Sequence, residues 1–133
     1  MATRTGAGRR ARAVVSIPVI VNGDVQGADD VVRALDETSC AAVMIGRAAI
    51  DHPWIFREAR ARLAGTTIAS PTTDERRAVY RALLVASVAA RGERAGVAAT
   101  KRHLGVLGPL APALRPRLVR ARTLVDALDI LDA

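Results

Sequence analysis

Two short polar turns carry the residues of this sequence that could bind a charged ligand. These residues are Asn22, Gly23 and Asp24 in the first turn, and Gly46 and Arg47 in the second. Glycine lets a ligand approach the backbone without meeting a Cβ atom, and exposed backbone N–H groups at such turns bind anions. Arg47 adds a planar guanidinium that can hold a phosphate with paired hydrogen bonds. The two turns therefore predict a phosphate site, in which Asp24 orients its neighbours because its own charge would repel the phosphate.

The elements around these turns alternate between strand and helix. Residues 17–21 and 41–45 are continuous apolar runs, as expected for strands covered on both faces. Residues 28–37 predict an amphipathic helix with acidic residues in its first turn, and residues 53–63 predict a second helix that begins with proline. This order predicts parallel strands with helical crossovers, so both turns should lie at the same edge of the sheet.

The rest of the chain predicts a basic leader, a linker and a helical domain. Residues 1–16 contain arginines and no acid, and we expect a disordered leader, although the composition also resembles a transit peptide or an RNA-binding arm. Residues 64–73 mix Gly, Pro, Ser and Thr and predict a linker. Thr72 and Glu75 form a capping box, so a helical domain should occupy residues 74–133.

The spacing of apolar residues divides this domain into several helices. In the first of them the apolar spacing predicts a buried face made by Val79, Leu83, Ala86 and Ala90. Glycine and proline punctuate the chain after it. The expected helices run from about residue 74 to 91, from 97 to 107, from 113 to 120, and from 123 to 131.

The charge balance bears on the partners of the protein. The 133 residues carry 20 basic and 13 acidic side chains, a formal net charge of +7, and Lys101 is the only lysine. Most of the excess positive charge lies after residue 73. An arginine-rich segment is compatible with binding to the phosphates of a nucleic acid. The alternative is that the arginines only solvate the helices.

Cysteine usage and apolar content limit the class of protein. Cys40 is the only cysteine, which excludes an internal disulfide and a cysteine-based zinc site, so no metal site is predicted. No apolar stretch approaches the roughly 20 residues of a membrane span. We therefore expect a protein of the reducing cytoplasm.

Several segments resemble one enzyme family. IPVIVNGDV, AAVMIGRAAIDHPWIF and REARARL together resemble the seventh and eighth strands of the tRNA-dihydrouridine synthases, which are flavin enzymes of barrel fold. Further along, GERAG and ATKRHL resemble the helical domain of that family. The likeness covers residues 17–131 and implies an α/β fold. In it, residues 17–63 are the last two β/α units of a TIM (β/α)8 barrel, followed by a small all-helical domain that binds tRNA.

The resemblance also implies an activity and a set of binding residues. The family reduces uridine to 5,6-dihydrouridine in tRNA with FMN as cofactor and NADPH as the usual source of hydride. Asn22, Gly23 and Asp24 match the first FMN-phosphate loop of the family, and Gly46 and Arg47 match the second. The residues that match its RNA-binding stretch are Lys101, Arg102 and His103.

This sequence departs from the family pattern in ways that bear on activity. The family has an aromatic pair where this chain has Gly105 and Val106, and its catalytic cysteine lies in an earlier strand-loop. Cys40 precedes the second strand and is expected to be a buried structural thiol. The resemblance therefore implies that the chain is inactive alone. Its missing barrel segment could come from another polypeptide, and open sheet edges predict association. The alternatives are a non-catalytic RNA-binding module, or a piece of another FMN-dependent barrel.

Overall fold

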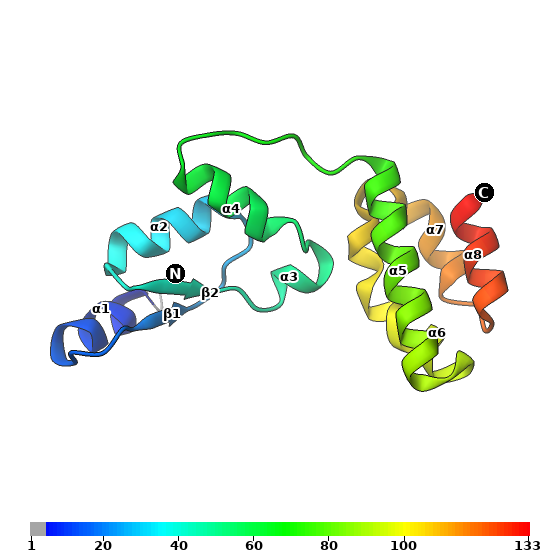
Figure 1. Ribbon diagram of the computed structural model, residues 1–133, viewed down its shortest axis with the longest axis horizontal. Helices are drawn as coiled ribbons and strands as arrows, with labels where there is room; N and C mark the ends of the chain where they lie inside the picture. The colour runs from blue at the N-terminus through cyan, green and yellow to red at the C-terminus, as the bar shows by residue number, and fades with distance from the viewer. Residues whose placement is uncertain (1–4) are drawn as a thin grey trace. The chain divides into compact units, whose positions relative to one another are not determined.

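The computed structural model describes residues 5–133 and divides the chain into two units, the first ending at Ala69 and the second beginning at Ser70. This division falls inside the segment 64–73 that was expected to be a linker. The first unit contains a two-stranded sheet and several helices (Figure 1). Its elements are α1 (Thr5–Val14), β1 (Ile20–Asn22), α2 (Ala28–Thr38), β2 (Ala42–Met44), α3 (Ala48–Asp51) and α4 (Ile55–Leu63).

The two strands are parallel, as the order of elements predicts. Ile20 is in register with Ala42, and Asn22 is in register with Met44. Helix α2 connects the strands, so the predicted strand, crossover helix and parallel strand are confirmed. Strand β1 is shorter than the apolar run 17–21, since Pro18 has no backbone N–H to donate to a neighbouring strand. The carboxyl ends of both strands lie at one edge of the sheet.

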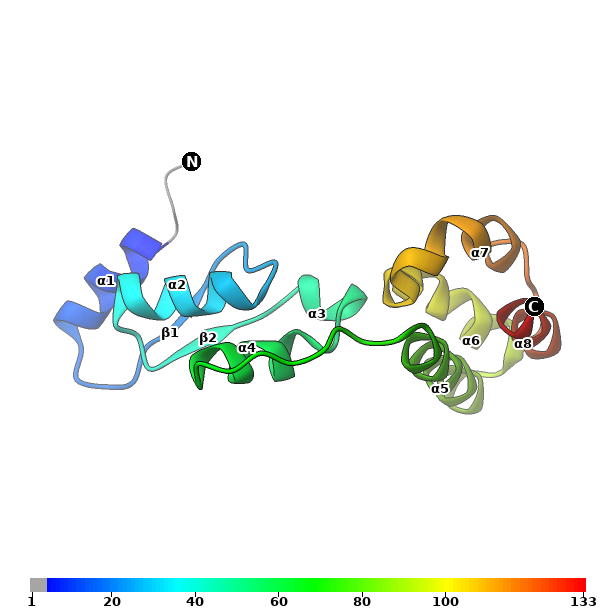
Figure 2. The same cartoon turned by 90° about the horizontal axis from the view of Figure 1, so that it is seen from above.

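Helices cover one face of this sheet. Val21 of β1 is buried with Ala34 of α2 and Cys40, while α2 and α4 pack against each other (Figures 1 and 2). On the opposite face, Ile20 and Met44 have exposed fractions of 63% and 51%. The expectation that both strands are covered on both faces is therefore wrong for the described residues, because their helices lie on one side only.

The expected disordered leader is also corrected in part. Residues 1–4 of that leader lie outside the described residues, but Thr5–Val14 forms helix α1. Alanine and arginine favour this helix, and Gly8 allows it to approach the sheet closely. A Cβ atom at Gly8 would lie 3.1 Å from Cγ2 of Val21, and the Cys40 thiol is 3.8 Å from the Gly8 carbonyl oxygen. Packing against β1 thus orders a segment that its composition alone predicts to be disordered.

The second unit consists of helices, and its first helix begins as predicted. The Thr72 hydroxyl accepts from the Glu75 N–H at 3.2 Å, and the Glu75 carboxylate accepts from the Thr72 N–H at 2.7 Å. The helix expected over residues 97–107 is instead an α-helix followed by a 3-10 helix, with Gly108 at a positive φ of 54°. The elements are α5 (Thr73–Arg91), α6 (Glu93–Thr100), η1 (Lys101–Leu110), α7 (Ala111–Leu118) and α8 (Leu124–Asp132).

The core of the helical unit lies on a different face of α5 from the predicted one. Tyr80 and Leu84 are 2% and 1% exposed, whereas Ala86 and Ala90, two of the predicted core residues, are exposed. Burial raises the pKa of Tyr80, whose hydroxyl donates to the Thr100 carbonyl at 3.4 Å. The contact with α6 therefore decides which face of α5 is buried.

Close approach of two helix backbones explains this choice of face. A Cβ atom at Gly96 of α6 would lie 2.4 Å from Cα of Val88 in α5. No side chain fits there, so only glycine allows α6 to pack at this distance.

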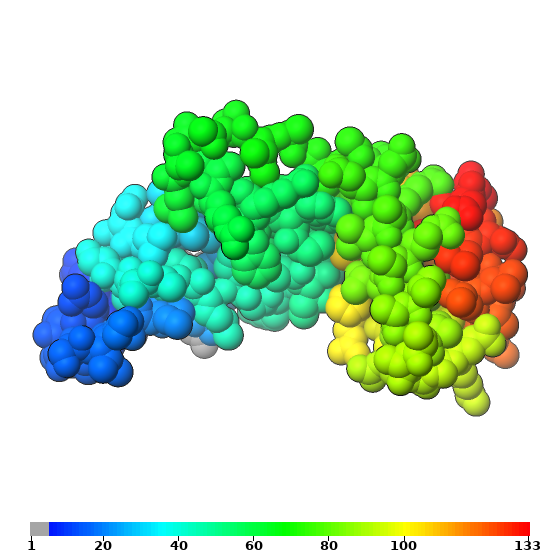
Figure 3. All heavy atoms as spheres, in the orientation of Figure 1, coloured from blue at the N-terminus to red at the C-terminus, as the bar shows by residue number. Residues whose placement is uncertain are grey.

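Helix α5 is also joined to α8 by arginine side chains. These two helices cover much of the face of the helical unit that Figure 3 shows. Arg77 donates to the Leu131 carbonyl oxygen, and Arg81 forms an ion pair with Asp132.

Across residues 5–133, no helix combines the length and the apolar character needed to cross a membrane.

Candidate functional site

An open hollow of about 610 Å³ lies at the carboxyl ends of the two parallel strands. Because β1 and β2 run the same way, the turns that follow them meet at this edge. The hollow includes polar side chains from both turns and from the segment that follows β2. Its lining residues are Asn22, Asp24, Val25, Gln26, Met44, Gly46, Arg47, Ala48, Asp51 and His52.

The structure brings together the site residues predicted from the two turns. Asn22, Asp24, Gly46 and Arg47 all line the hollow, and Gly23 lies between the first two in the chain, half-buried. Arg47 Nη2 donates to Asp24 Oδ1 at 3.3 Å. The Arg47 side chain is 91% exposed, so this ion pair is a weak surface contact that leaves its guanidinium accessible to a ligand.

Gly46 has no structural reason to be glycine within the described residues. A Cβ atom built there meets no atom within 4 Å, in contrast to the crowding at Gly96. Its φ is also outside the left-handed region, where the described glycines are Gly65, Gly92 and Gly108. A side chain at Gly46 would therefore extend into open space beside the hollow, which is the space that a bound ligand would fill.

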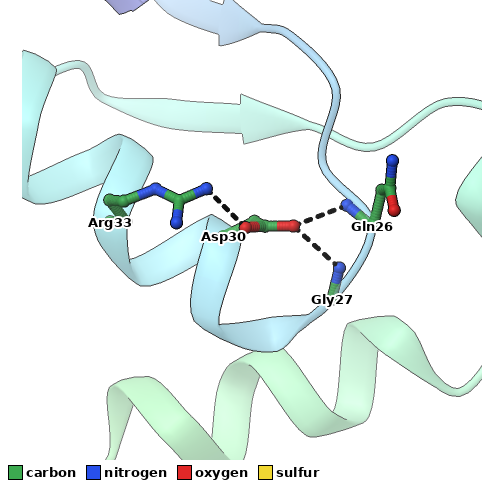
Figure 4. A network of polar contacts seen from close by, with 4 residues as sticks. All are labelled: Gln26, Gly27, Asp30 and Arg33. Carbon is green, nitrogen blue, oxygen red and sulfur yellow. Dashed lines mark hydrogen bonds and ion pairs between the residues drawn. The ribbon is translucent and has the colours of Figure 1, made fainter. Parts of the chain in front are cut away.

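The first turn is held to helix α2 by one carboxylate. Asp30 Oδ2 accepts from the backbone N–H groups of Gln26 at 2.9 Å and Gly27 at 3.2 Å (Figure 4). Asp30 Oδ1 accepts from Arg33 Nη2 at 2.6 Å. The hydrogen bond from Gln26, helped by Arg33 and Gly27, lowers the pKa of Asp30. The capping carboxylate thus fixes the path of the loop between Asn22 and α2.

The second turn leads into a segment that sequence reasoning did not recognise as part of the site. Helix α3 has only four residues and reads as a loop in the sequence. After it, His52 lines the hollow and its Nε2 lies 2.7 Å from Glu58 Oε2 in α4. The His52 and Trp54 rings are 5.9 Å apart at an angle of 50°. His52 and Glu58 are six residues apart, which is not a spacing at which helical side chains meet, so no sequence signal points to this pair.

An ion pair joins the two helices behind the hollow. Arg62 Nε of α4 lies 2.6 Å from Asp29 Oδ1 of α2. The hydrogen bond and charge of Asp29 raise the pKa of Arg62. Both side chains are well exposed, so the buried contact of Val31 with Ile55 and Ala59 contributes most of the packing between these helices.

The three residues matched to an RNA-binding stretch lie together at the start of η1 in the helical unit. Lys101 Nζ donates to the Val119 carbonyl oxygen at 2.6 Å. Arg102 Nε donates to the Ala99 carbonyl oxygen at 3.2 Å. His103 is half-buried and departs from helical geometry, with φ −99° and ψ 15°. Lys101 therefore contacts the end of α7, a role that its position in the sequence does not reveal.

Cys40 lies away from the hollow. It precedes β2 and is 7% exposed, with its thiol against Gly8 of α1. The prediction of a buried thiol at the other end of the strand from Gly46 is confirmed.

Comparison with known proteins identifies a family that covers most of the chain. The sequence profile described as Dihydrouridine synthase (Dus) matches residues 9–113. A probable tRNA-dihydrouridine synthase of Mycobacterium leprae is 35% identical over 122 residues, which are 89% of this chain and 32% of that protein. One from Rhodobacter capsulatus is 35% identical over 116 residues, 83% of this chain and 35% of that protein.

A shorter stretch is more similar still. A probable tRNA-dihydrouridine synthase of Aquifex aeolicus is 48% identical over 50 residues, 38% of this chain and 16% of that protein. In each comparison the matched part of this chain spans about a third or less of the length of the relative.

Proposed function

This chain belongs to the dihydrouridine synthase family, and on that premise we propose that it provides the phosphate-binding end of an FMN site together with a tRNA-binding helical unit. The reaction served is the reduction of uridine to 5,6-dihydrouridine in tRNA, with NADPH as the reductant. The relatives are named as tRNA-dihydrouridine synthases, and in this proposal the present chain contributes two parts of the machinery.

One observation supports the cofactor site above all others. Asn22 at the end of β1, Asp24 just after it, and Gly46 and Arg47 after β2 line one hollow at the carboxyl edge of parallel strands. The loops after the last two strands of a (β/α)8 barrel commonly hold a phosphate. We therefore assign β1–α2 and β2–α4 to the last two units of such a barrel. Further strands, supplied by a neighbouring polypeptide segment, would cover the exposed face that carries Ile20.

The residues present fit the phosphate end of FMN. Arg47 provides an exposed guanidinium, Asn22 provides an amide, and Gly46 leaves open the space that a Cβ atom would fill. FMN, when bound, supplies a flavin ring that accepts hydride from NADPH and passes it to the uracil ring. In this chain Arg47 binds the phosphate, while Asp24 lies beside the Arg47 guanidinium and Asp30 fixes the loop that follows β1.

We do not expect the 133 residues alone to catalyse the reduction of uridine. Protonation of the uracil ring in this family depends on a cysteine, and the one cysteine here, Cys40, is buried against α1.

A second candidate function is a non-catalytic RNA-binding module. The helical unit has its own core, in which Leu107 and Leu131 are fully buried. This core favours a unit that folds by itself and binds RNA without the first unit. On this unit Lys101, Arg102 and His103, which match the RNA-binding stretch of the family, mark the proposed RNA-facing side, and the hydrogen bond from Lys101 to the Val119 carbonyl makes Lys101 a residue that positions this side.

A third reading is a segment of another FMN-dependent barrel. It shares the two phosphate loops but would not need the helical unit to bind tRNA. Binding of tRNA by the full chain separates it from the first two readings, and binding of FMN separates the first from the second.

The cofactor proposal is tested by titrating the full chain with FMN and with riboflavin, which lacks the phosphate. Backbone amide signals in the NMR spectrum report where each binds. We expect a protein that is colourless as purified, in which FMN shifts the signals of Gly23 and Gly46 and riboflavin does not. Arg47→Gln should weaken FMN binding about tenfold, the effect of losing one charge-assisted hydrogen bond.

A matched control removes the same charge elsewhere in the unit. Arg60 of α4 is exposed and does not line the hollow, so Arg60→Gln should leave FMN affinity unchanged. Equal shifts with FMN and riboflavin, or equal effects of the two variants, would contradict a phosphate site at these turns.

A further inference from the structure

Nine of the eleven lysine and arginine side chains of the helical unit fall into two groups, and Arg91 and Arg94 belong to neither. One group donates to the backbone or to a carboxylate of the same unit and holds its elements together. Arg76 donates to the Val106 carbonyl at 3.1 Å, and Lys101 donates to the Val119 carbonyl at 2.6 Å. The other residues of this group are Arg77, Arg81 and Arg102.

The second group lies on and just after the end of α7. It consists of Arg115, Arg117, Arg120 and Arg122, all of them exposed. Among the described residues none of these four side chains forms an ion pair or a side-chain hydrogen bond. We call residues 115–122 the arginine turn.

The backbone of the arginine turn is well held. Leu114 and Leu118 are buried in the core and so is Ala121, so apolar anchors alternate with the exposed arginines. The Arg120 N–H donates to the Arg117 carbonyl at 3.0 Å, and the Lys101 ammonium binds the adjacent Val119 carbonyl. Four guanidinium groups are therefore presented from a fixed turn.

No carboxylate neutralises this surface from the chain around it. Residues 94–125 contain no aspartate or glutamate. Glu93, just before that stretch, accepts from the Leu124 N–H at 3.0 Å, and Asp132 of α8 pairs with Arg81. Glu93 and Asp132 thus bind away from the arginine turn, and positive charge gathers on this segment. Figure 2 shows α7 and the chain that leads from it to α8.

The geometry points to the arginine turn as the surface that contacts the phosphate backbone of RNA, with Lys101 acting as a residue that positions the turn. This proposal rests on the proposed function and names the residues that serve it. Arginine binds phosphate through paired hydrogen bonds, and a polyanion can engage several arginines at once. Tyr80, the one Phe, Trp or Tyr of the unit, is buried, so it cannot stack on bases and the interaction follows the phosphates.

The test measures binding of the full chain to unfractionated tRNA between 50 and 300 mM KCl. In one variant the four arginines of the turn become glutamine. The control variant makes the same change in charge at four exposed arginines outside the arginine turn and outside residues 1–16. The control substitutions are Arg33→Gln, Arg60→Gln, Arg91→Gln and Arg94→Gln.

We expect the first variant to lose most of its affinity at 100 mM KCl. Its plot of log K against log[KCl] should flatten by about 3, since each lost phosphate contact removes about 0.7 to 0.9 from the slope. The control variant should keep a slope near that of the unchanged protein. A third variant with lysine at the four positions should keep the slope but bind less tightly, because the charge remains and the fork is lost.

Each other outcome has a definite meaning. Equal losses of affinity in the glutamine variant and the control would contradict the proposed role of the arginine turn. They would mean that tRNA binds through the net charge of the chain. No binding of tRNA by the unchanged protein overturns the proposed function itself. Equal affinity for vesicles that contain phosphatidylserine would show that the surface recognises anions in general, and the assignment to RNA would be wrong. Because the four side chains are exposed and form no ion pair or side-chain hydrogen bond among the described residues, circular dichroism should show all variants folded.

Discussion

Arg47 Nη2 lies 3.3 Å from Asp24 Oδ1, although the two residues are 23 positions apart in the sequence. The contact joins the ends of two parallel strands and brings a cation to the rim of the hollow that they share. Here the strand, helix, strand unit creates this contact. Asp24 and Arg47 are therefore brought together by the fold, and Arg47 is the residue of the pair that can bind a ligand.

Two aspartates near the hollow should differ in their effect on stability. Asp30→Asn removes a capping carboxylate that accepts from Gln26 and Gly27, so the free energy of unfolding should fall by about 1 kcal/mol. Asp24→Asn breaks only an exposed ion pair and should change it by less than about 0.5 kcal/mol. Urea unfolding of both variants checks this, and equal losses would contradict the assigned role of Asp30.

The contribution of Asp30 should also depend on pH. Its pKa is lowered in the folded protein from a reference of 3.8, so the folded state favours the ionised form. The stabilisation is complete above the pKa of the unfolded chain and is lost as the pH falls below about 4. The difference in stability between the unchanged protein and Asp30→Asn should therefore be constant from pH 5 to 7. It should shrink toward pH 3, and urea midpoints across this range measure it.

Two glycines should respond in opposite ways to the addition of a methyl group. Gly96→Ala places a Cβ atom 2.4 Å from Val88 and should destabilise the helical unit by about 1–3 kcal/mol. Gly46→Ala meets no atom and should leave the melting temperature unchanged while weakening FMN binding. Thermal unfolding together with FMN titration checks both. A stable Gly96→Ala protein would show that α5 and α6 are farther apart.

Lys101 should act on stability more than on RNA affinity. Lys101→Met removes the hydrogen bond to Val119 and should lower the free energy of unfolding by about 1 kcal/mol. The salt slope of tRNA binding should not change, whereas a direct phosphate contact would reduce it by about 0.9. Lys101→Arg should restore stability if the carbonyl contact is what matters.

The exposed face of the sheet should make the chain associate. Ile20 is 63% exposed on the face opposite the helices, and Ile20→Lys should reduce self-association seen by sedimentation velocity. Val125 of α8 is 65% exposed and serves as a matched control, because a single exposed valine on a helix has no strand edge beside it. Equal effects of Ile20→Lys and Val125→Lys would mean that the sheet face is not responsible.

Local chemistry explains which parts of the fold were predictable. The capping box at Thr72 and Glu75 depends on residues three apart, and the parallel strands follow from two apolar runs separated by one helix. Four of the five predicted site residues of the first unit line the hollow for the same reason, since each lies at the end of a strand or within three residues after it. Such features depend on short stretches of chain.

Features decided by distant contacts were not predictable. Helix α5 carries apolar or small residues around most of its circumference, so the pattern did not show that Tyr80 and Leu84, one residue beyond the predicted Val79 and Leu83, make the buried face. Gly96 decides this face from another helix. Likewise the contact with Val21 orders α1, and the contact of His52 with Glu58 places the His52 ring at the hollow.

The burial of Cys40 beneath Gly8 gives this chain a native reporter of local opening. The thiol can be alkylated only when α1 moves off the sheet, and no second cysteine competes for the reagent. The labelling rate under native conditions, compared with the rate in urea, therefore gives the free energy of detaching α1 without a single substitution.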